Sequence, residues 1–286
     1  MTELVPLPNL LVEPIVRAAL TEDLGRAGDI TTNAVVTADA QFSGAVVARR
    51  EGTIAGTQAA LIALNLVDPD VAVSVILPDG SRVSEGDTIL HIEGPARAVL
   101  TAERTALNLM CHLSGVATVT AELVAAVGNN KARITCTRKT TPNLRTLEKH
   151  AVRAGGGVSH RFGLDDGILI KDNHVALAGG IRPAIQRAKS NIGHMVKIEV
   201  EVDTLEQLDE ALSEGVDAVL LDNMDPETLR RAVQTIDGWA ISEASGRITA
   251  DQVPAVAASG VDIISAGWIT HSAPALDLGL DFGVAA

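Results

Sequence analysis

The second half of the chain repeats one unit, a short β-rich run followed by a helical segment. Four of these runs end close to Glu201, Asp222, Ser245 and Gly267, so about 22 residues separate each end from the next. That interval is the length of one strand plus one helix, and strands joined through helices lie parallel in one sheet. The repeat therefore predicts a parallel α/β array.

Six βα units favour a closed or incompletely closed barrel over a doubly wound sheet. No glycine-rich nucleotide-binding turn marks a doubly wound half, and we interpret Gly155 to Gly157 as a flexible loop. The predicted strands are Arg133–Thr137, Gly167–Ile170, Val196–Val202, Ala218–Leu221, Trp239–Ala244 and Ile263–Ala266. The predicted helices between the later strands are Leu205–Ser213, Pro226–Thr235 and Ala250–Ser259.

The first third of the chain has mixed patterns, which predict a separate α/β region. Helical spacing covers Glu13–Leu24 and Gln58–Leu66, and strand patterns cover Phe42–Arg50, Val71–Leu77 and Thr88–Glu93. A long helical pattern from Ala98 to Val127 is interrupted near Ser114 and Gly115. That interruption predicts either two helices or one kinked helix.

The composition limits the class of protein. At 286 residues, with 47% apolar and 21% charged side chains, the sequence predicts one large or two medium globular domains. Two cysteines, Cys111 and Cys136, are too few for a disulfide framework or a thiolate zinc site, so a reducing cytoplasm is expected. Neither a secretory signal nor an apolar run near the ~20 residues that span a membrane is expected.

Charge is distributed unevenly along the chain. A net charge of −13 and a scarcity of aromatic residues argue against nucleic-acid binding. Residues 131–171 are the exception, with nine Lys and Arg against three Asp and Glu. Arg145, Lys149 and Arg153 follow helical spacing and are expected to be solvated. The remaining cations lie at predicted strand ends or in loops, which indicates a site for a small polyanion.

Chemically active residues of α/β barrels lie where strands end and loops begin. Glu201 and Asp222 end neighbouring predicted strands, and such a pair can share Mg²⁺, which binds few carboxylates and bridges substrate phosphates. Cations at other strand ends favour carboxylates and phosphates, and Ser245, Gly246 and Gly267 offer backbone N–H groups to a phosphate. The pattern predicts a site for a phosphorylated sugar and an acidic partner.

Five segments of the chain closely resemble the quinolinate phosphoribosyltransferase family, also called nicotinate-nucleotide pyrophosphorylase (carboxylating). They are LTAERTALNLMCHLSGVAT (100–118), TRKTTPNLRTLEKHAVRAGGGVSHRFGLDDGILIKDNH (137–174), IEVEVDTLEQL (198–208), LLDN (220–223) and ASGRIT (244–249). The resemblance spans nearly the whole chain. It implies a pentosyltransferase of NAD biosynthesis that converts quinolinate and phosphoribosyl pyrophosphate to nicotinate mononucleotide, CO₂ and pyrophosphate with Mg²⁺.

The resemblance also implies the architecture. The family has an N-terminal α/β sandwich and a C-terminal incomplete α/β barrel of the type II phosphoribosyltransferase kind. Residues 1–115, joined by the C-terminal segment 275–286, would form the sandwich, and residues 116–274 the catalytic barrel. In the family's homodimer, which can assemble further, each sandwich closes the partner's barrel, so the active sites are shared between subunits.

Site residues carried over from the resemblance fall into four groups. Quinolinate binding is implied for Arg104, Arg138, His160, Arg161 and Lys171, with Arg104 reaching the neighbouring subunit's site. Lys139 and Thr140 resemble phosphoribosyl pyrophosphate contacts, and Lys139, Lys171, Glu201 and Asp222 resemble the catalytic set. Glu201 and Asp222, assisted by Asp172, resemble the metal ligands. Ser245, Gly246, Gly267 and His271 resemble the cup for the 5′-phosphate, in which Arg247 stands where many relatives carry glycine.

Two other functions stay open. Lys171 at a strand end also fits a barrel aldolase that forms a Schiff base, although that function leaves the arginines and the paired acids unexplained. A related protein associated with molybdate transport shares much of the pattern. Retention of both Arg138 and Arg161 favours a dicarboxylate substrate.

Overall fold

The structure is a computed structural model that describes residues 4–283 and divides them into two compact units. Unit 1 contains the described residues up to 121, residues 140–156 and the described residues from 270 onward. Unit 2 contains residues 122–139 and 157–269. The boundaries expected from the family resemblance were 115/116 and 274/275, and the expected termini at 1–3 and 284–286 lie outside the described residues.

Unit 1 is built on a four-stranded antiparallel sheet in the order β12-β1-β5-β3. The strands are β1 (Gln41–Ala48), β3 (Ala72–Val75), β5 (Thr88–Pro95) and β12 (Leu278–Phe282), and β2 (Gly52–Thr53) pairs separately with β4 (Arg82–Val83). The helices are α1 (Asn9–Leu24), α2 (Ile30–Val35), α3 (Thr57–Val67), α4 (Ala96–Val127), α5 (Arg145–Ala154) and α11 (Trp268–His271). Two of the boundaries between the units fall within α4 and α11, and the other two follow residues 139 and 156.

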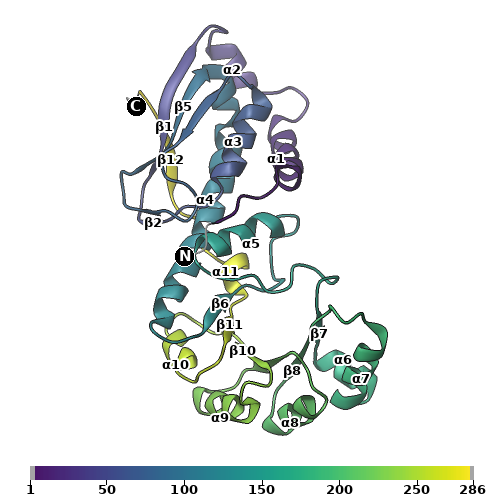
Figure 1. Cartoon of the computed structure of the whole chain (residues 1–286). Helices are drawn as coiled ribbons and strands as arrows, with labels where there is room; N and C mark the ends of the chain where they lie inside the picture. The colour runs from purple at the N-terminus through teal and green to yellow at the C-terminus, as the bar shows by residue number, and fades with distance from the viewer. Residues whose placement is uncertain (1–3, 284–286) are drawn as a thin grey trace. The chain divides into compact units, whose positions relative to one another are not determined.

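Helices α3 and α4 cover one face of this sheet, and α1 lies beyond α3 (Figure 1). Val46 and Leu90 from the sheet, Leu64 from α3 and Met110 from α4 are all buried and line one small gap between the layers. Apolar side chains from helices and strands thus share a single core. The expected N-terminal α/β sandwich is confirmed.

The C-terminal segment completes the sheet of unit 1. Strand β12 pairs antiparallel with β1, so that Gly44 lies opposite Phe282 and Ala48 opposite Leu278. A side chain at Gly44 would collide with the carbonyl oxygen of Asp281, 2.2 Å from an ideal Cβ, and the Phe42 ring packs 5.5 Å from the Phe282 ring. Glycine is therefore required where β12 approaches β1.

Helix α4 is one uninterrupted helix, so the expected break near residues 114–115 is not present as a separation into two helices. Ser114 instead donates a hydrogen bond to the carbonyl oxygen of Ala55 and accepts one from its backbone N–H. An ideal Cβ on Gly115 would lie 2.1 Å from the carbonyl oxygen of Pro274. These small residues allow close packing against two other segments of unit 1 rather than ending the helix.

Helix α4 is also long and apolar enough to cross a membrane by length and composition alone, so the expectation that no segment reaches that length was wrong. Its most apolar window is 56% buried within the protein. The buried core helix of a globular protein passes the same test, and the side chains of α4 that pack against the sheet account for its apolar character.

Helix α5 is more deeply buried than its charge suggested. Leu147 to Val152 are all buried, and Lys149 retains only 2% of its accessible surface. The carboxylate of Glu148, fully buried, accepts the backbone N–H of Thr141 and lies 2.8 Å from His112 Nε2. The prediction of a solvated basic face along this helix was therefore wrong for Lys149.

Unit 2 is a six-stranded parallel sheet in the order β6-β11-β10-β9-β8-β7. The strands are β6 (Arg133–Thr135), β7 (Ile168–Ile170), β8 (Ile198–Val202), β9 (Ala218–Asp222), β10 (Ile241–Ser245) and β11 (Ile263–Ser265). The last strand pairs with the first, and β6 and β7 form the two edges. Figure 1 shows these strands in an arc, as expected for an incomplete barrel.

Helices surround the outside of this arc (Figure 1). They are α6 (Asp172–Ala178), α7 (Ile181–Asn191), α8 (Leu205–Ser213), α9 (Pro226–Ile236) and α10 (Val253–Ala257). Thr204 caps α8 and Asp225 caps α9 through hydrogen bonds to backbone N–H groups, and Pro226 occupies the first turn of α9. These start signals explain why α8 and α9 begin at the predicted residues; α8 also ends as predicted, and α9 ends one residue later than predicted.

The amino ends of the strands carry a repeated polar contact. The tripeptide Gly-Val-Asp precedes both β9 and β11, ending at Asp217 and Asp262. Asp217 accepts the backbone N–H of Ile198 and a hydrogen bond from the Lys197 ammonium, whereas Asp262 accepts the backbone N–H of Ser242 and pairs with Lys131 at 2.7 Å. Each aspartate thereby joins its own strand to a neighbour.

We expect Asp262→Asn to lower the free energy of unfolding by about 1–2 kcal/mol at pH 7, because an ionic hydrogen bond is lost at a partly exposed site. Burial alone would raise the pKa of Asp262, but Lys131 and the Ser242 hydrogen bonds outweigh it and lower the pKa. A lowered pKa stabilises the fold above the unfolded value of about 4 and ceases to do so as pH falls further. In urea unfolding, the difference in the free energy of unfolding between wild type and Asp262→Asn should therefore become smaller below about pH 4.

Asp251→Asn is the matched control, since Asp251 is exposed in the same unit. Equal unfolding free energies for the Asp262→Asn variant and wild type at pH 7 would contradict a stabilising role for this contact.

Candidate active site

The carboxyl ends of the unit 2 strands surround a cavity of about 280 Å³. Segments far apart in sequence contribute to it because parallel strands end on the same side of the sheet. The lining residues are Thr137, Arg138, Lys139, His160, Arg161, Leu169, Lys171, Leu220, Glu243, Ser245 and Ser265. Four cations thus line one cavity, an arrangement suited to a small polyanion.

Arg138 and Arg161 are the two guanidinium groups of this cavity. Arg161 Nη1 donates to the carbonyl oxygen of Gly167 at 3.0 Å, which holds the side chain across the segment before β7. Burial, followed by the positive charge of Arg138, lowers the pKa of Arg161. Two cations that oppose each other in this way favour an anion placed against both.

Lys171 and two acids occupy the neighbouring strand ends. The Lys171 ammonium is 2.6 Å from Glu201 Oε2, although the lysine side chain remains 47% exposed. Burial, then the negative charge of Glu201, raises the pKa of Asp222, while Lys171 and Lys139 oppose that shift. Two carboxylates that repel each other can both bind one divalent cation, and Mg²⁺ prefers oxygen ligands. Glu201 and Asp222 therefore have the chemistry to hold Mg²⁺.

The loops after β9 and β10 touch through backbone atoms. The N–H of Asn223 donates to the carbonyl oxygen of Ser245, and an ideal Cβ on Gly246 would lie 2.3 Å from Asn223 Oδ1. Gly246 has a φ of 106° and the following Arg247 a φ of 49°, both in the left-handed region that favours glycine. This backbone explains why glycine suits position 247 and leaves the exposed Arg247 conformationally strained.

Gly267 lies beside the first strand end of the site. An ideal Cβ at Gly267 would come within 2.9 Å of Lys139 Cδ and 3.3 Å of Thr137 Oγ1. Thr137 Oγ1 also accepts the backbone N–H of Lys139 at 3.0 Å. The absence of a side chain at Gly267 therefore leaves room for Lys139 at the rim.

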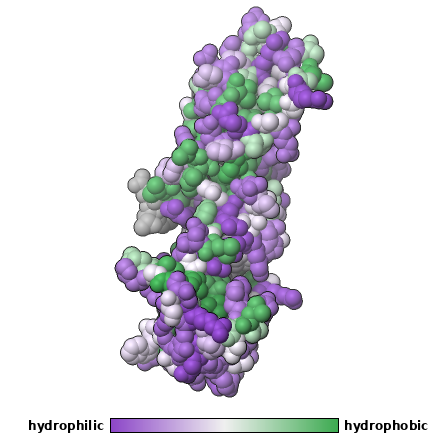
Figure 2. Space-filling model, turned by 90° about the vertical axis from the view of Figure 1, so that its right-hand side faces the viewer, coloured by the Kyte–Doolittle hydropathy of each residue, from purple (hydrophilic) through white to green (hydrophobic). Residues whose placement is uncertain are grey.

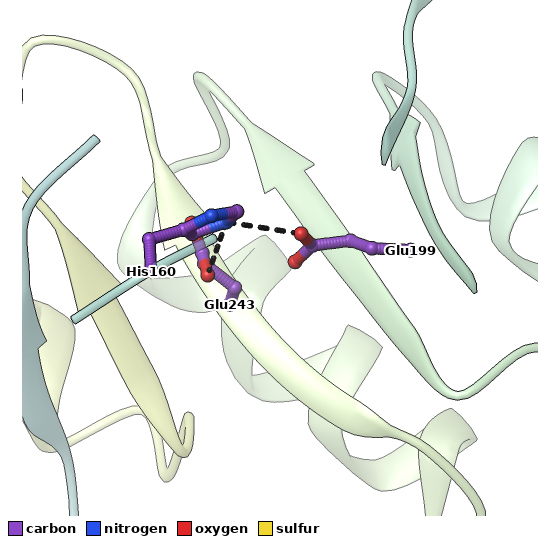
Figure 3. A group of neighbouring side chains, drawn as sticks. All are labelled: His160, Glu199 and Glu243. Atoms are coloured by element: carbon purple, nitrogen blue, oxygen red, sulfur yellow. Dashed lines mark ion pairs between the residues drawn. The ribbon is translucent and has the colours of Figure 1, made fainter. Parts of the chain in front are cut away.

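His160, Glu199 and Glu243 form a cluster of three side chains (Figure 3). His160 Nε2 lies 3.0 Å from Glu199 Oε2 and 3.5 Å from Glu243 Oε2. The backbone N–H of Arg161 donates to His160 Nδ1 at 2.7 Å, which assigns the imidazole proton to Nε2. Burial, then the negative charge of Glu199, raises the pKa of Glu243 to about 7.

The same three residues have ligand atoms within 4.8 Å of one another, a spacing that can hold a cation. A histidine that binds metal through Nε2 donates its Nδ1–H to a neighbour. Here Nδ1 accepts a hydrogen bond instead, so Nε2 carries the proton and faces the carboxylates. The cluster is arranged to hold protons rather than a metal ion.

The other predicted site residues lie elsewhere. Asp172 is exposed at the start of α6, where its Oδ1 accepts the backbone N–H of Asn173. Arg104, Thr140 and His271 belong to unit 1. Arg104 is 64% exposed and lies 3.9 Å from Glu103, and it lines a separate cavity of about 300 Å³ with Asp29, Thr101 and neighbouring residues.

Glu199 and Glu243 lie within the predicted strands Val196–Val202 and Trp239–Ala244, but sequence reasoning assigned them no role. Glu199 and Glu201 are two residues apart on β8, as are Glu243 and Ser245 on β10, so each pair faces the same side of its strand. This alternation could have indicated that Glu199 and Glu243 face the same side of the sheet as the predicted site residues Glu201 and Ser245. What the sequence could not supply was the contact of His160 with both acids.

The fold and the cavity define a class, proteins with a parallel α/β barrel whose strand ends carry an anion-binding site. Residues 116–281 match the family model for the quinolinate phosphoribosyl transferase C-terminal domain, and residues 29–114 match that for the N-terminal domain. The chain belongs to the quinolinate phosphoribosyltransferase family.

Named relatives and solved structures agree with this membership. The chain is 42% identical over 96% of its length to a probable nicotinate-nucleotide pyrophosphorylase (carboxylating) of Bacillus subtilis, covering 94% of that protein. It is 45% identical to the Mycobacterium leprae protein named nicotinate-nucleotide pyrophosphorylase (carboxylating), covering 93% of this chain and 95% of that protein. The crystal structure of NadC from Streptococcus pyogenes superposes with a TM-score of 0.93 at 38% identity, covering 97% and 99% of the two chains.

Gly246→Ala should destabilise unit 2 and displace the loop after β10, because the new methyl group would meet Asn223. Gly238→Ala is the control: its φ of 78° is also left-handed, but nothing lies within 4 Å of the added Cβ. We expect about 1 kcal/mol of destabilisation for Gly238→Ala and at least about 2 kcal/mol for Gly246→Ala in urea unfolding. Equal losses in the two variants would show that the contact with Asn223 imposes no constraint.

Proposed function

We propose that this chain transfers the phosphoribosyl group of phosphoribosyl pyrophosphate to quinolinate, with loss of CO₂, to give nicotinate mononucleotide and pyrophosphate for NAD biosynthesis. The observation that carries the proposal is the cavity that Arg138, Lys139, Arg161 and Lys171 line together. Membership of the quinolinate phosphoribosyltransferase family supports it.

Quinolinate is a pyridine dicarboxylate and thus carries two negative charges. We assign its carboxylates to Arg138 and Arg161, because guanidinium groups pair with carboxylates through two parallel hydrogen bonds. His160 and Lys171 complete this half of the site. Held in this way, the weakly nucleophilic ring nitrogen is oriented against the ribose C1, which reduces the entropic part of the barrier.

Lys139 and Thr140 are assigned to phosphoribosyl pyrophosphate, with Lys139 and Lys171 placed to stabilise negative charge on the departing pyrophosphate. Ser245, Gly246, Gly267 and His271 are assigned to the 5′-phosphate, a group that backbone N–H groups can bind. After the N-glycosidic bond forms, the pyridinium ring accepts the electron pair that the breaking bond to the C2 carboxylate releases. The C2 carbon then takes a proton as CO₂ leaves.

Mg²⁺ is assigned to Glu201 and Asp222, with Asp172 as a further ligand. When bound, this ion would neutralise charge on the pyrophosphate. The raised pKa of Asp222 beside Glu201 supports the assignment of these two acids. Asp172 is supported by sequence resemblance alone.

The aldolase alternative is weakened by the contact of Lys171 with Glu201. A Schiff-base lysine must lose its proton to attack a carbonyl group, whereas a carboxylate at 2.6 Å stabilises the ammonium form. Borohydride in the presence of carbonyl substrates should therefore leave Lys171 unmodified.

A cytoplasmic location and the absence of nucleic-acid and membrane partners remain expectations from composition.

The proposal is tested by incubating the protein with quinolinate, phosphoribosyl pyrophosphate and Mg²⁺ and analysing the products by mass spectrometry. Nicotinate mononucleotide and pyrophosphate are expected in equal amounts. A protein of the molybdate-associated kind would yield neither product, and that result would overturn the proposal.

Arg138→Ala and Arg161→Ala should each weaken quinolinate binding by about 2–5 kcal/mol, because one carboxylate loses its charged partner in a partly buried site. Binding of phosphoribosyl pyrophosphate should change far less. Calorimetry with each substrate separates the two effects, and an equal loss for both substrates would contradict the assignment.

Glu201→Gln and Asp222→Asn should each raise the Mg²⁺ concentration needed for half-maximal activity, since each removes one negative charge from the proposed metal site. Quinolinate affinity measured without metal should stay close to that of wild type. Glu214→Gln, at the end of α8, is the control for loss of an acid from unit 2. Unchanged metal dependence in both site variants would reject a metal role.

We also propose that the protein is a homodimer, or a higher oligomer built from dimers, in which Arg104 enters the partner's site. Arg104 is largely exposed, and its cavity is also lined by Ile30 and Leu100, two exposed apolar side chains. On the face shown in Figure 2, hydrophobic residues gather in patches among hydrophilic ones. Exposed apolar patches are typical of protein interfaces, and a two-fold interface would give each subunit one Arg104 from its partner.

Mixing two inactive variants tests this sharing. After subunit exchange between Arg104→Ala and Lys139→Ala proteins, half of the dimers are mixed, and each mixed dimer has one intact site. Activity should therefore recover to about a quarter of the wild-type value. Lack of recovery after exchange has been verified by native mass spectrometry would place Arg104 outside the partner's site.

A further inference from the structure

Glu243 is a buried acid to which the proposed reaction assigns no role. It is 4% exposed, and its Oε1 has no hydrogen-bond partner within the part of the chain that the structure describes. It nevertheless belongs to the lining of the substrate cavity. An ionised carboxylate in such a place is costly, because a buried oxygen without a partner loses its solvation.

The groups around Glu243 decide the cost of its charge. Glu199 faces it from β8, His160 from the segment before β7, and the Ser265 hydroxyl from β11, while β9 places the apolar Leu220 beside it. Glu199 repels a second negative charge, and His160 already directs its single Nε2 proton toward Glu199 at 3.0 Å. Of these neighbours, none supplies a full positive charge to Glu243 when His160 is neutral.

A dicarboxylate in the cavity would shift the equilibrium between ionised and protonated Glu243 toward the protonated form. Its charges would pair with Arg138 and Arg161, so those cations would stabilise a nearby carboxylate less, and the substrate itself would repel one. Both effects favour the protonated form of Glu243. Substrate binding and proton binding at Glu243 must then strengthen each other, because such coupling is reciprocal.

We propose that Glu243 is a positioning residue that binds a proton when the dicarboxylate enters the cavity. Its neutral carboxyl group can donate a hydrogen bond to Glu199, which removes the repulsion between the two acids while His160 keeps its own contact with Glu199. This keeps the His160 ring in place, and His160 Nδ1 in turn holds the backbone N–H of Arg161. The inference rests on the proposed function, since it requires an anionic substrate at the arginines.

The coupling has a defined sign. The unliganded pKa of Glu243 is near 7, and a bound dianion would raise it further. Above about pH 7, binding should therefore draw up to one proton per site from solution, and the dissociation constant should rise by up to about tenfold per pH unit. Below that pH the carboxyl is already protonated, so both effects should disappear.

Isothermal titration calorimetry measures this directly. Quinolinate is titrated into the wild-type protein at pH 7.5 in buffers with different heats of ionisation, alone and with Mg²⁺ and pyrophosphate present. The dependence of the binding heat on the buffer gives the number of protons taken up, expected to lie between about one half and one.

Glu243→Gln supplies the decisive comparison. An amide presents one acceptor and one donor, as the protonated carboxyl does, but it cannot titrate. Its binding heat should no longer depend on the buffer, and its dissociation constant should be independent of pH between about 6.5 and 8.5. Glu227→Gln, which removes an exposed acid from α9 of the same unit, should behave like wild type.

Proton uptake that persists in Glu243→Gln would assign the proton to another group and overturn the inference. Quinolinate binding to wild type without proton uptake would overturn it while leaving the proposed function intact, and this measurement does not depend on any variant folding. No quinolinate binding under either condition would overturn the proposed function and the inference together.

Discussion

Like charges held close together on β8, β9 and β10 are the constraint on which unit 2 depends. Four acids meet there, two of them paired with a basic side chain and two with raised pKa values. Glu201 pairs with Lys171, Glu199 accepts from His160, and Asp222 and Glu243 have raised pKa values because they are buried near other acids. Cations from the segment after β6, from the segment before β7 and from the residue after β7 line the same cavity. A site with cations and acids in different places suits the two proposed substrates, because quinolinate carries its negative charge on carboxylates and phosphoribosyl pyrophosphate carries it on phosphates.

In α/β barrels, residues at the amino ends of the strands stabilise the fold and residues toward the carboxyl ends carry the chemistry. At the amino ends, Asp217 and Asp262 make several hydrogen bonds apiece and have lowered pKa values, the mark of acids that stabilise the fold. Asp222, the last residue of β9, and Glu243, in the middle of β10, have pKa values shifted upward. Acids with perturbed pKa values that line or adjoin a cavity are typical of functional sites.

Much of unit 2 could be predicted because its signals are local. The cap at Thr204 and the proline at 226 define two helices, and the repeat of strand and helix defines the parallel sheet. Contacts between segments far apart in the sequence could not be predicted from these local signals. Lys149 resembles a solvated helix residue by spacing but is buried, and Ser114 and Gly115 resemble a helix break but allow close packing. The cluster of His160 with two acids likewise depends on three separate strands and loops meeting.

The proposed function requires that the chain couples transfer of the phosphoribosyl group to loss of the C2 carboxylate of quinolinate. Two preparations of quinolinate, one labelled with ¹⁴C in the C2 carboxyl and one in the C3 carboxyl, test it most directly. With phosphoribosyl pyrophosphate and Mg²⁺ present, we expect one labelled CO₂ per nicotinate mononucleotide from the first preparation and none from the second. Release from the C3 carboxyl, release without phosphoribosyl pyrophosphate, or no release at all would contradict this coupling.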